Sequence, residues 1–261
     1  DDIRVVVIKL CDRLHNIKTL QYVNEEKQKR IALETLEIHA RLADRLGMGR
    51  LKAELEDNAF PYVYKAEYER TKELMNGSSI MSDESLDQVA NNLRDELKIL
   101  DVTIDRVDHR IKHIYSLWQK LKKNNYEIEK VYDIVALRII TPSLADCYQA
   151  LGVVHGLYRP VPGRFKDYIA VPKPNGYRSL HTTVFDGSGA TLEIQIRTQS
   201  MHEEAEYGIA SHLGYKEHGD NQSKSKIEKN TGWTRELLEW QKGVAKHDEF
   251  ILDTLRAYFL Y

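Results

Sequence analysis

Two acidic residues in the second half of the sequence are candidates for one shared chemical role. The first is Glu193. Residues 191–197 alternate between apolar and polar side chains, so a strand here turns Glu193, Gln195 and Arg197 to one face. This polar face could carry chemistry, because the apolar face can pack the strand. A sheet with one solvated face would show the same alternation, so a second acidic position is needed to decide.

The second acidic side chain is Asp133, inside the otherwise apolar segment 131–140, which we expect to form a strand. A buried carboxylate without a partner is costly. Two carboxylates on neighbouring strands could share Mg²⁺, which prefers a few carboxylates together with phosphate oxygens of a substrate. A salt bridge or a cap at the strand end is the alternative role for Asp133.

Residues 110–123 are expected to form a helix with one basic half. This half carries Arg110, Lys112, His113, Ser116, Lys120 and Lys123. Basic side chains gathered on one side of a helix could bind a triphosphate. A solvated, lysine-rich helix face would have the same composition, and that alternative stays open.

Two loops, residues 162–168 and 172–181, are rich in Gly, Pro, basic and aromatic residues, and such loops present side chains rather than bury them. Tyr177 could offer its ring for a nucleotide base to stack on, a contact typically worth ~1–3 kcal/mol. Lys173 and Arg164 are near enough in sequence to contact phosphates. An ordinary turn with a packed tyrosine is the alternative.

In the first half of the chain, Asp12, His15 and Asn16 fall close together on an expected helix. Asp12 and Asn16, four residues apart, share one face of that helix. A metal site needs more ligands than these, so the residues alone indicate a polar helix face.

The elements that must position these residues differ between the two halves. Apolar side chains recur at helical intervals over residues 25–60, with two glycines between two helices. A loop is expected at residues 76–79, and residues 82–85 supply an N-terminal cap for a helix that ends near Leu100. The first half is therefore expected to be a helical hairpin or part of a bundle.

Beyond Tyr126 the apolar period changes to two, which indicates strands. The expected strands are residues 131–140, 168–171, 181–185 and 191–197, with residues 186–189 closing the last two into a hairpin. With a helix expected at residues 145–158, this half is α/β or α+β with a mainly antiparallel or mixed sheet. Residues 219–230 are typical of a polar linker, and residues 233–261 of a helix.

The composition narrows the class of protein. Of the 261 residues 42% are apolar, enough for one large domain or two smaller ones, and the net charge of −2 gives no basic field for nucleic acid or an anionic membrane. Two cysteines, both expected in the core, and no apolar span of ~20 residues favour a soluble, cytoplasmic protein. The sequence begins without an initiator methionine or a leading cap, so we expect a fragment.

Taken together, the motifs resemble those of the long alarmone enzymes of the Rel/SpoT family. The similarity runs from Lys9 to about Glu217 and is densest from Arg110 to Lys216. It includes five segments, residues 132–138, 163–170, 175–184, 193–198 and 202–210. It implies an α+β chain in three parts. These are a helical remnant of an HD-type hydrolase domain with its connecting bundle (1–78), a nucleotidyltransferase-like (p)ppGpp synthetase domain with a mixed sheet of about five strands flanked by helices (79–218), and a polar linker with a C-terminal helix (219–261).

In this family the synthetase moves pyrophosphate from ATP to the 3′-hydroxyl of GDP or GTP and releases AMP. The resemblance implies that Asp133 and Glu193 hold Mg²⁺ and that Glu193 also takes the proton of the attacking hydroxyl. The residues implied on the ATP side are Arg110, Lys112, His113, Ser116, Lys120 and Arg138. Those implied on the GDP or GTP side are Tyr177, Lys173, Asn175, His181, Gln195, Arg164 and Lys166. Residues 164–167 match the basic form of a family tetrad, which implies a bifunctional parent.

For the hydrolase, Asp12 resembles one ligand of the family's Mn²⁺, and Asn16 and Thr19 resemble residues of its nucleotide pocket. The His and His-Asp ligands expected before them are absent from the sequence, so hydrolase activity is predicted to be lost. His109 stands where the family usually has a glycine and could change or cap the start of the helix expected at residues 110–123.

Three hypotheses remain. The leading one is a truncated (p)ppGpp synthetase whose partners are ATP and GDP or GTP, with neither membrane nor DNA, and with ribosome binding conceivable only for the full-length parent. The alternative is a guanine-nucleotide-binding module held catalytically inactive in this truncated form, which would bind nucleotide without turnover. The third is a Mn²⁺-dependent alarmone hydrolase built on Asp12.

Overall fold

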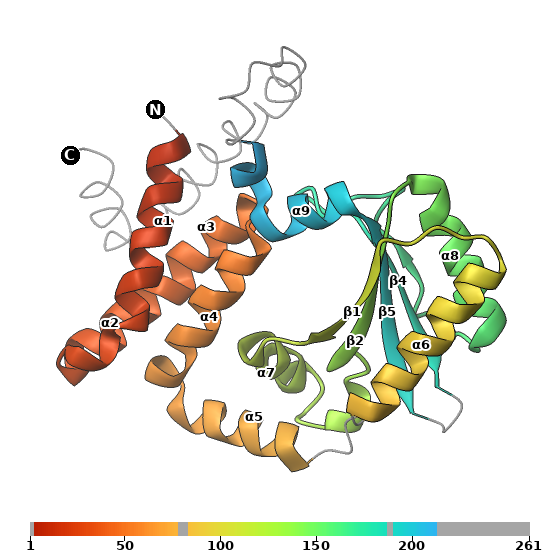
Figure 1. Ribbon diagram of the computed structural model, residues 1–261. Helices are drawn as coiled ribbons and strands as arrows, with labels where there is room; N and C mark the ends of the chain where they lie inside the picture. Colours follow the sequence, from red (N-terminus) through yellow and green to blue (C-terminus); the bar gives the residue numbers. More distant parts are fainter. Residues whose placement is uncertain (1–2, 78–82, 187–189, 213–261) are drawn as a thin grey trace. The chain divides into compact units, whose positions relative to one another are not determined.

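The computed structural model of the chain describes residues 3–77, 83–186 and 190–212 (Figure 1). The described residues up to Ser211 belong to one compact unit. The linker expected at residues 219–230 and the helix expected at 233–261 lie outside the described residues. So do residues 78–82 and the hairpin turn residues 187–189. The domain boundaries expected after residues 78 and 218 stay predictions.

The first half of the chain is helical, as predicted. Its helices are α1 Ile3–Lys18, α2 Glu25–Glu34, α3 Ala40–Arg45, α4 Gly49–Val63 and α5 Lys65–Gly77, with a 3₁₀ turn at Leu20–Tyr22 and a π-helical turn, Thr35–His39, that joins α2 to α3. Asn24 caps α2, because its side chain accepts a hydrogen bond from the Lys27 backbone N–H at 3.0 Å. Gly47, at φ +70°, lies in the break between the two predicted helices. The expected loop begins at Asn76, but Asn76 and Gly77 are the last residues of α5, so the prediction is wrong for these two residues.

A five-stranded mixed sheet forms the second half, which confirms the α+β class. Its strands are β1 Arg106–Ile111, β2 Val135–Thr141, β3 Lys166–Asp167, β4 Leu180–Phe185 and β5 Thr191–Thr198, in the order β1-β2-β5-β4-β3. β2 and β5 run parallel, and the other neighbours are antiparallel. The central strands β2 and β5 are the most buried, since their residue types are largely β-branched and apolar.

Helices α6 Asp83–Ile99 and α8 Leu144–Leu157 cover one face of this sheet (Figure 1). The core between them contains apolar side chains of α6, α8, β2 and β5, among them Leu93, Leu97, Val154, Leu137 and Ile194. Each such side chain contributes about 1.5–3 kcal/mol on full burial. The helix expected at residues 145–158 is confirmed as α8, which Ser143 caps by accepting the Asp146 backbone N–H at 3.2 Å.

The opposite face of the sheet is also covered. Helix α9 Gln199–Tyr207 packs on β2 and β5, α4 packs on both α9 and α7 Ile114–Lys123, and α5 packs on α7. Short 3₁₀ turns, Ile128–Lys130 and Gly208–His212, complete this side. Glu193, Gln195 and Arg197 are therefore buried, at 9%, 3% and 1% exposure. The alternative of a sheet with one solvated face is wrong for this strand.

Three sequence-based element predictions are wrong at their bounds. The helix expected at residues 110–123 begins only at Ile114, because residues 106–111 pair with β2 as strand β1. The strand expected at residues 131–140 begins at Val135, and Asp133 lies in a turn before it. Residues 168–171 form a turn after β3, since Asp167 Oδ1 accepts the backbone N–H groups of Ile169 and Ala170.

Two smaller expectations can also be compared with the fold. Within the described residues no helix is both long enough and apolar enough to cross a membrane. Cys147 is buried as expected, but Cys11 is exposed on α1, so its expected place in the core is wrong.

Candidate active site

One face of the sheet gathers polar side chains from all five strands, because strand register sets residues of like orientation side by side. This face carries Arg110 of β1, Arg138 of β2, Glu193 and Gln195 of β5, His181 of β4 and Lys166 of β3. Arg138 pairs with Gln195 across β2 and β5, and Gln195 pairs with His181 across β5 and β4. Arg110 Nη1 also donates a hydrogen bond to Gln195 Oε1 at 3.0 Å. Six of the predicted site residues are thus brought together by register.

Asp133 lies in the turn before β2 and is held by two lysines. Lys112 Nζ donates to Asp133 Oδ2 at 2.8 Å, and Lys120 Nζ of α7 contacts the same oxygen. Burial alone would raise the pKa of Asp133, but Lys112 and Lys120 outweigh it and lower that pKa to about 2. The carboxylate is therefore ionised at neutral pH. The salt bridge, which the sequence left as an alternative role, is present.

Glu193 is held by His181 in a directed chain of hydrogen bonds. His181 Nδ1 lies 2.6 Å from Glu193 Oε1, and an ionised carboxylate only accepts, so Nδ1 is the donor. His181 Nε2 is then the acceptor for the Tyr177 hydroxyl at 2.8 Å. Burial raises the pKa of Glu193, but the bond from His181 outweighs it and the net shift is downward. Burial also lowers the pKa of His181 itself.

The two carboxylates suit a divalent cation that is completed by substrate oxygens. Both are ionised and lie within electrostatic reach of each other, since the charge of Asp133 acts to raise the pKa of Glu193. Mg²⁺ is commonly bound by one or two carboxylates together with phosphate oxygens rather than by a full protein cage. Within residues 3–77, 83–186 and 190–212, no three His, Cys, Asp or Glu side chains are arranged to hold a metal ion. The donor set therefore fits a metal that arrives with a phosphorylated ligand.

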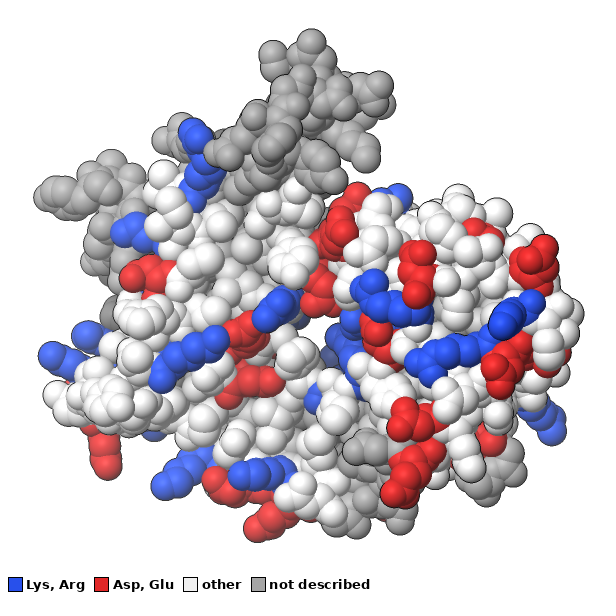
Figure 2. Space-filling model, viewed as in Figure 1, with Lys and Arg blue, Asp and Glu red and all other residues white. Residues whose placement is uncertain are grey.

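A cavity of about 300 Å³ opens beside this face of the sheet, within the size range of small-ligand sites. Seven predicted residues line it, namely Arg110, His113, Ser116, Arg138, Lys173, Asn175 and Tyr177. Its opposite wall belongs to the helical half, with Asp44, Gly47, Gly49, Arg50, Lys52, Ala53 and Glu56. Acidic and basic side chains are interspersed over the face of the molecule in Figure 2. Among the residues lining the cavity, lysines and arginines outnumber carboxylates, which favours an anionic ligand.

Helix α9 adds a buried charge network to the same cavity. Glu206 Oε1 lies 3.2 Å from Arg197 Nη2 and 3.5 Å from Arg138 Nη1, so one carboxylate serves two guanidinium groups. Arg197 Nη2 also donates to His202 Nδ1 at 2.7 Å. Burial lowers the pKa of His202 to about 4, assisted by the charge of Arg197, so this imidazole is a neutral acceptor. Burial and Arg197 likewise lower the pKa of Arg138 to about 10.

Among the residues that the structure describes, two guanidinium atoms in this network have no hydrogen-bond partner. They are Nε of Arg138 and Nε of Arg197, both fully buried. A buried donor without an acceptor is energetically costly. These two N–H groups can therefore donate to an acceptor atom of a ligand at this end of the cavity. Sequence reasoning had placed Arg197 on the polar face but gave it no role, and it missed Glu206 and His202. The spacing of His202 and Glu206, four apart on one helix, was the available signal.

Tyr177 lies in a tight turn, which agrees with the alternative that the sequence left open for this residue. Gly176, at φ +79°, donates its backbone N–H to the Lys173 carbonyl oxygen at 2.8 Å, and Asn175 Oδ1 accepts the Tyr177 N–H at 3.2 Å. Lys173 Nζ lies 4.9 Å from the centre of the Tyr177 ring, and burial lowers the pKa of this lysine. Tyr168 meets the Tyr177 ring edge-on at 6.2 Å. Stacking of a base on Tyr177 stays a prediction.

Eight residues predicted for the synthetase site are not among those that line the cavity, namely Asp133, Glu193, Lys112, Lys120, His181, Gln195, Lys166 and Arg164. The Arg164 guanidinium lies over the Tyr132 ring at 4.6 Å. His109 lies in β1 and contacts Asp87 of α6 at 3.3 Å, so it neither starts nor caps a helix, and that expectation is wrong.

The three residues assigned to the hydrolase lie on or just after α1, outside the cavity. Asn16 Nδ2 donates to Asp12 Oδ2 at 3.1 Å, as expected for residues four apart on a helix. The Thr19 hydroxyl donates to backbone carbonyl oxygens of its own helix, His15 O and Asn16 O, at 3.2 Å each.

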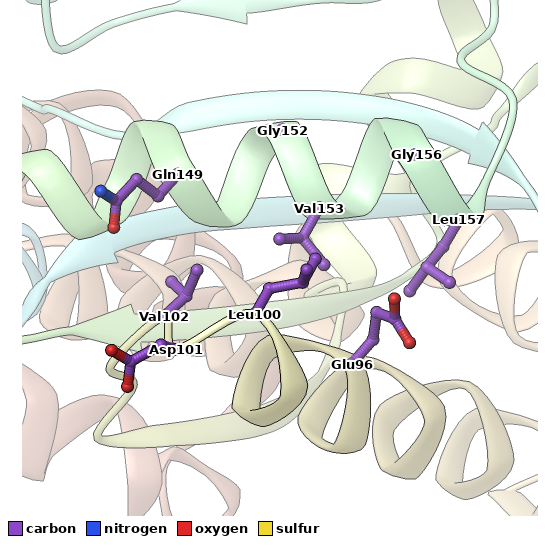
Figure 3. A pocket seen from close by; sticks show the side chains of 9 residues that line it. All are labelled: Glu96, Leu100, Asp101, Val102, Gln149, Gly152, Val153, Gly156 and Leu157. Atoms are coloured by element: carbon purple, nitrogen blue, oxygen red, sulfur yellow. The ribbon is translucent and has the colours of Figure 1, made fainter.

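A second cavity, of about 670 Å³, lies between α6 and α8 (Figure 3). Its charged lining residues are Glu96 and Asp101, and the others include Leu100, Val153 and Leu157. The residues that line this cavity include no lysine or arginine, so it offers no charge complement to a phosphorylated ligand. Tyr177, Glu193 and Asp133 do not line it.

Arginines and lysines border one cavity, while the ionised carboxylates lie close by, Glu193 on the same face of the sheet and Asp133 in the turn before β2, and such an arrangement would suit a phosphorylated ligand. Residues 109–220 match the family described as the region found in RelA / SpoT proteins, and residues 1–49 match an HD domain. The chain is a homologue of Rel/SpoT proteins over nearly its whole length.

Three relatives illustrate this homology. The chain is 46% identical over 98% of its length to a guanosine-3′,5′-bis(diphosphate) 3′-pyrophosphohydrolase of Aquifex aeolicus, covering 36% of that protein. It is 45% identical over 96% of its length to a probable enzyme of the same name from Synechocystis, and 44% identical over 98% to a GTP pyrophosphokinase of Myxococcus xanthus, covering 33% of each. The chain thus spans about a third of the curated relatives it matches.

Among solved structures, small alarmone synthetase 1 of Bacillus subtilis bound to its product pppGpp matches with 28% identity and a TM-score of 0.40. The match covers 62% of this chain and 92% of that one.

Proposed function

We propose that the chain transfers pyrophosphate from ATP to the 3′-hydroxyl of GDP or GTP, giving (p)ppGpp and AMP. The observation that carries this proposal is a cavity lined by more lysines and arginines than carboxylates on the sheet face that holds ionised Glu193, with ionised Asp133 in the turn that leads into β2. Relatives named for synthesis and for hydrolysis match about equally well, so the choice depends on the site. A nucleotide-transfer site needs alignment and charge neutralisation more than a covalent intermediate, and this site offers both.

On the ATP side, Arg110, Arg138, His113 and Ser116 border the cavity, and Lys112 and Lys120 converge on Asp133. Asp133 and Glu193 would hold Mg²⁺, which would neutralise charge on the transferred phosphates. With a metal ion as the counter-charge of Asp133, both lysines would be free to donate to phosphate oxygens. Lys112 and Arg138 are the buried cations of this group, so burial has already removed part of their hydration and a phosphate would interact strongly with them.

On the acceptor side, Tyr177, Lys173, Asn175, His181 and Gln195 would contact GDP or GTP, with Lys166 at the edge of the sheet. Glu193 is ionised and buried, so it can accept the proton of the 3′-hydroxyl as that oxygen attacks the β-phosphorus of ATP. AMP is the leaving group. The Arg164 guanidinium lies over the ring of Tyr132, the residue before Asp133. Arg164 would have to move away from that ring before it could bind phosphates of the acceptor.

For the HD-type region, Asp12 would hold Mn²⁺ only within an intact hydrolase domain, and loss of hydrolysis in this chain stays a prediction. We also propose a cytoplasmic location, which suits the supply of ATP and guanine nucleotides. Ribosome binding would belong to the full-length parent alone, and neither a membrane nor DNA is a proposed partner.

The test is a turnover assay with ATP, Mg²⁺ and either GDP or GTP, which follows AMP and the 3′-pyrophosphorylated product together. We expect both products in equal amounts. Glu193→Gln, which keeps the side-chain shape, should lower kcat at least a thousandfold, or about 4 kcal/mol. Glu203→Gln, an exposed carboxylate on α9 that bonds Gln199, is the matched control and should leave turnover unchanged. Turnover that survives Glu193→Gln would refute the assignment of the base.

The alternative, a guanine-nucleotide-binding module without catalysis, has one structural observation in its favour. Both carboxylates already have cationic or hydrogen-bonding partners, so the site is satisfied without a metal. Calorimetric binding of GDP with no AMP release at any Mg²⁺ concentration would favour this function over the first.

A further inference from the structure

Helix α7, which carries Ser116 and Lys120, has no N-terminal cap of its own. Its N-cap residue, His113, makes no side-chain capping bond. The first N–H groups of a helix need acceptors from outside the helix, and a carboxylate is favoured there by the helix dipole. The acceptor for α7 must therefore come from elsewhere in the chain.

Asp57, on α4 of the helical half, supplies that acceptor. Its Oδ1 accepts the Tyr115 backbone N–H at 3.0 Å, and its Oδ2 accepts from His113 Nδ1 at 2.9 Å. A single carboxylate thus bonds both the first turn of α7 and the side chain immediately before it. Asp57 is not among the residues that line the cavity, but His113, which it bonds, is one of them, so its effect on a ligand passes through His113 and α7.

An aromatic cluster supports the same contact between α4 and α7. Phe60 of α4 packs against Tyr115 at 5.2 Å and Trp118 at 4.9 Å between ring centres, and Tyr64 packs against Trp118 at 4.9 Å. Such rings bury a large apolar area and prefer offset or edge-to-face arrangements. The two directed hydrogen bonds of Asp57 add to this packing and hold the N-terminus of α7 against α4.

We propose that Asp57 is a positioning residue for the ATP side of the site: it caps α7 from the helical half and so sets where Ser116 and Lys120 meet the phosphates. This inference rests on the proposed function. The consequence is that the helical half, beyond forming one wall of the cavity, sets the geometry of a helix in the synthetase half. A loss of the cap should weaken ATP binding and leave the acceptor side, on β4 and β5, largely unaffected.

The experiment compares the 261-residue chain with Asp57→Ala and Asp57→Asn. Alanine removes both acceptors, whereas asparagine keeps Oδ1 for the Tyr115 N–H. We expect Asp57→Ala to raise the KM for ATP about tenfold, equivalent to ~1.4 kcal/mol, with the KM for GDP within twofold of wild type. Asp57→Asn should stay within about threefold for both nucleotides. Ser143→Ala, which removes the cap of α8 on the far face of the sheet, is the matched control and should change neither KM.

Two further measurements keep the inference separate from the proposed function. Calorimetric titration with a non-hydrolysable ATP analogue reports affinity even without turnover, and hydrogen exchange reports protection of the Tyr115 amide. An inactive wild type that binds the analogue about tenfold more tightly than Asp57→Ala refutes the transfer reaction but supports the cap. Faster exchange at Tyr115 with unchanged analogue affinity overturns the positioning role, and so does an equal loss of GDP affinity. If the alanine variant does not fold, Asp57→Glu can replace it, because glutamate keeps the charge but displaces it. Asp57→Glu should also lower the affinity for the ATP analogue. Unchanged affinity in this variant would overturn the positioning role.

Discussion

Removal of the Glu206 carboxylate should destabilise the fold, because it is the acceptor shared by Arg138 and Arg197. Arg197 is 1% exposed, Arg138 has 12% of its side chain exposed, and both already have an unpaired Nε. Glu206→Ala would leave two buried guanidinium groups without a counter-charge. His202 would not replace it, since burial keeps the pKa of that imidazole near 4 and leaves it neutral.

The size of this effect can be worked out from the structure. Removing one partner of a buried ion pair typically costs about 3–5 kcal/mol. Glu206 is itself 26% exposed, so water can reach part of the site and we reduce the expected loss to ~2–3 kcal/mol. For a unit of this size, each kcal/mol lowers Tm by roughly 2–4 °C, so Tm should fall by about 4–12 °C.

The assay is thermal unfolding followed by circular dichroism, with Glu203→Ala as the control. Glu203 lies on the same helix, is exposed and bonds only Gln199 among the contacts described for it, so its removal should shift Tm by less than about 2 °C. Sulfate should restore part of the Tm lost in Glu206→Ala, because an anion that binds the folded state stabilises it. Equal, small shifts in both variants would refute the idea that one carboxylate neutralises this end of the cavity.

Three further outcomes are expected. Burial raises the pKa of Glu56 to about 7. The stability that Glu56 contributes is therefore full below its ordinary pKa of 4.5 and is lost as pH rises through about 7. In urea unfolding, the Glu56→Gln variant should be ~1–3 kcal/mol more stable than wild type at pH 8 and equally stable at pH 4. Gly208→Ala should cost ~2–4 kcal/mol, because its φ is +54° and a Cβ would overlap the Leu46 carbonyl oxygen, whereas Gly152→Ala, in open space on a helix, should gain about 0.5–1 kcal/mol. Tyr177→Ala should raise the KM for GDP about tenfold to a hundredfold, while Tyr177→Phe, which keeps the ring, should change it less than fivefold, and equal effects of the two would exclude stacking.

Local pattern was a good guide where one element could be recognised from its own residues. The alternation at residues 191–197, the helix near residues 145–158 and the glycine break between two helices were all confirmed. Pattern failed at the start of the helix expected at residues 110–123, because Arg110 and Ile111 belong to an edge strand, β1. Its pairing with β2, not its propensity, decides that conformation.

Sequence by itself determined which chemical groups this chain possesses: the carboxylates of Asp133 and Glu193, the surrounding cations, and the helical and strand periods that carry them. Only the tertiary structure decided which of these groups meet. The register of β1, β2, β5 and β4 aligns Arg110, Gln195 and His181 on one face, and the packing of α9 gives Arg138 and Arg197 a common acceptor. Such contacts join residues far apart in the chain, and their energy depends on burial and on distances of a few ångströms, which no local spacing encodes.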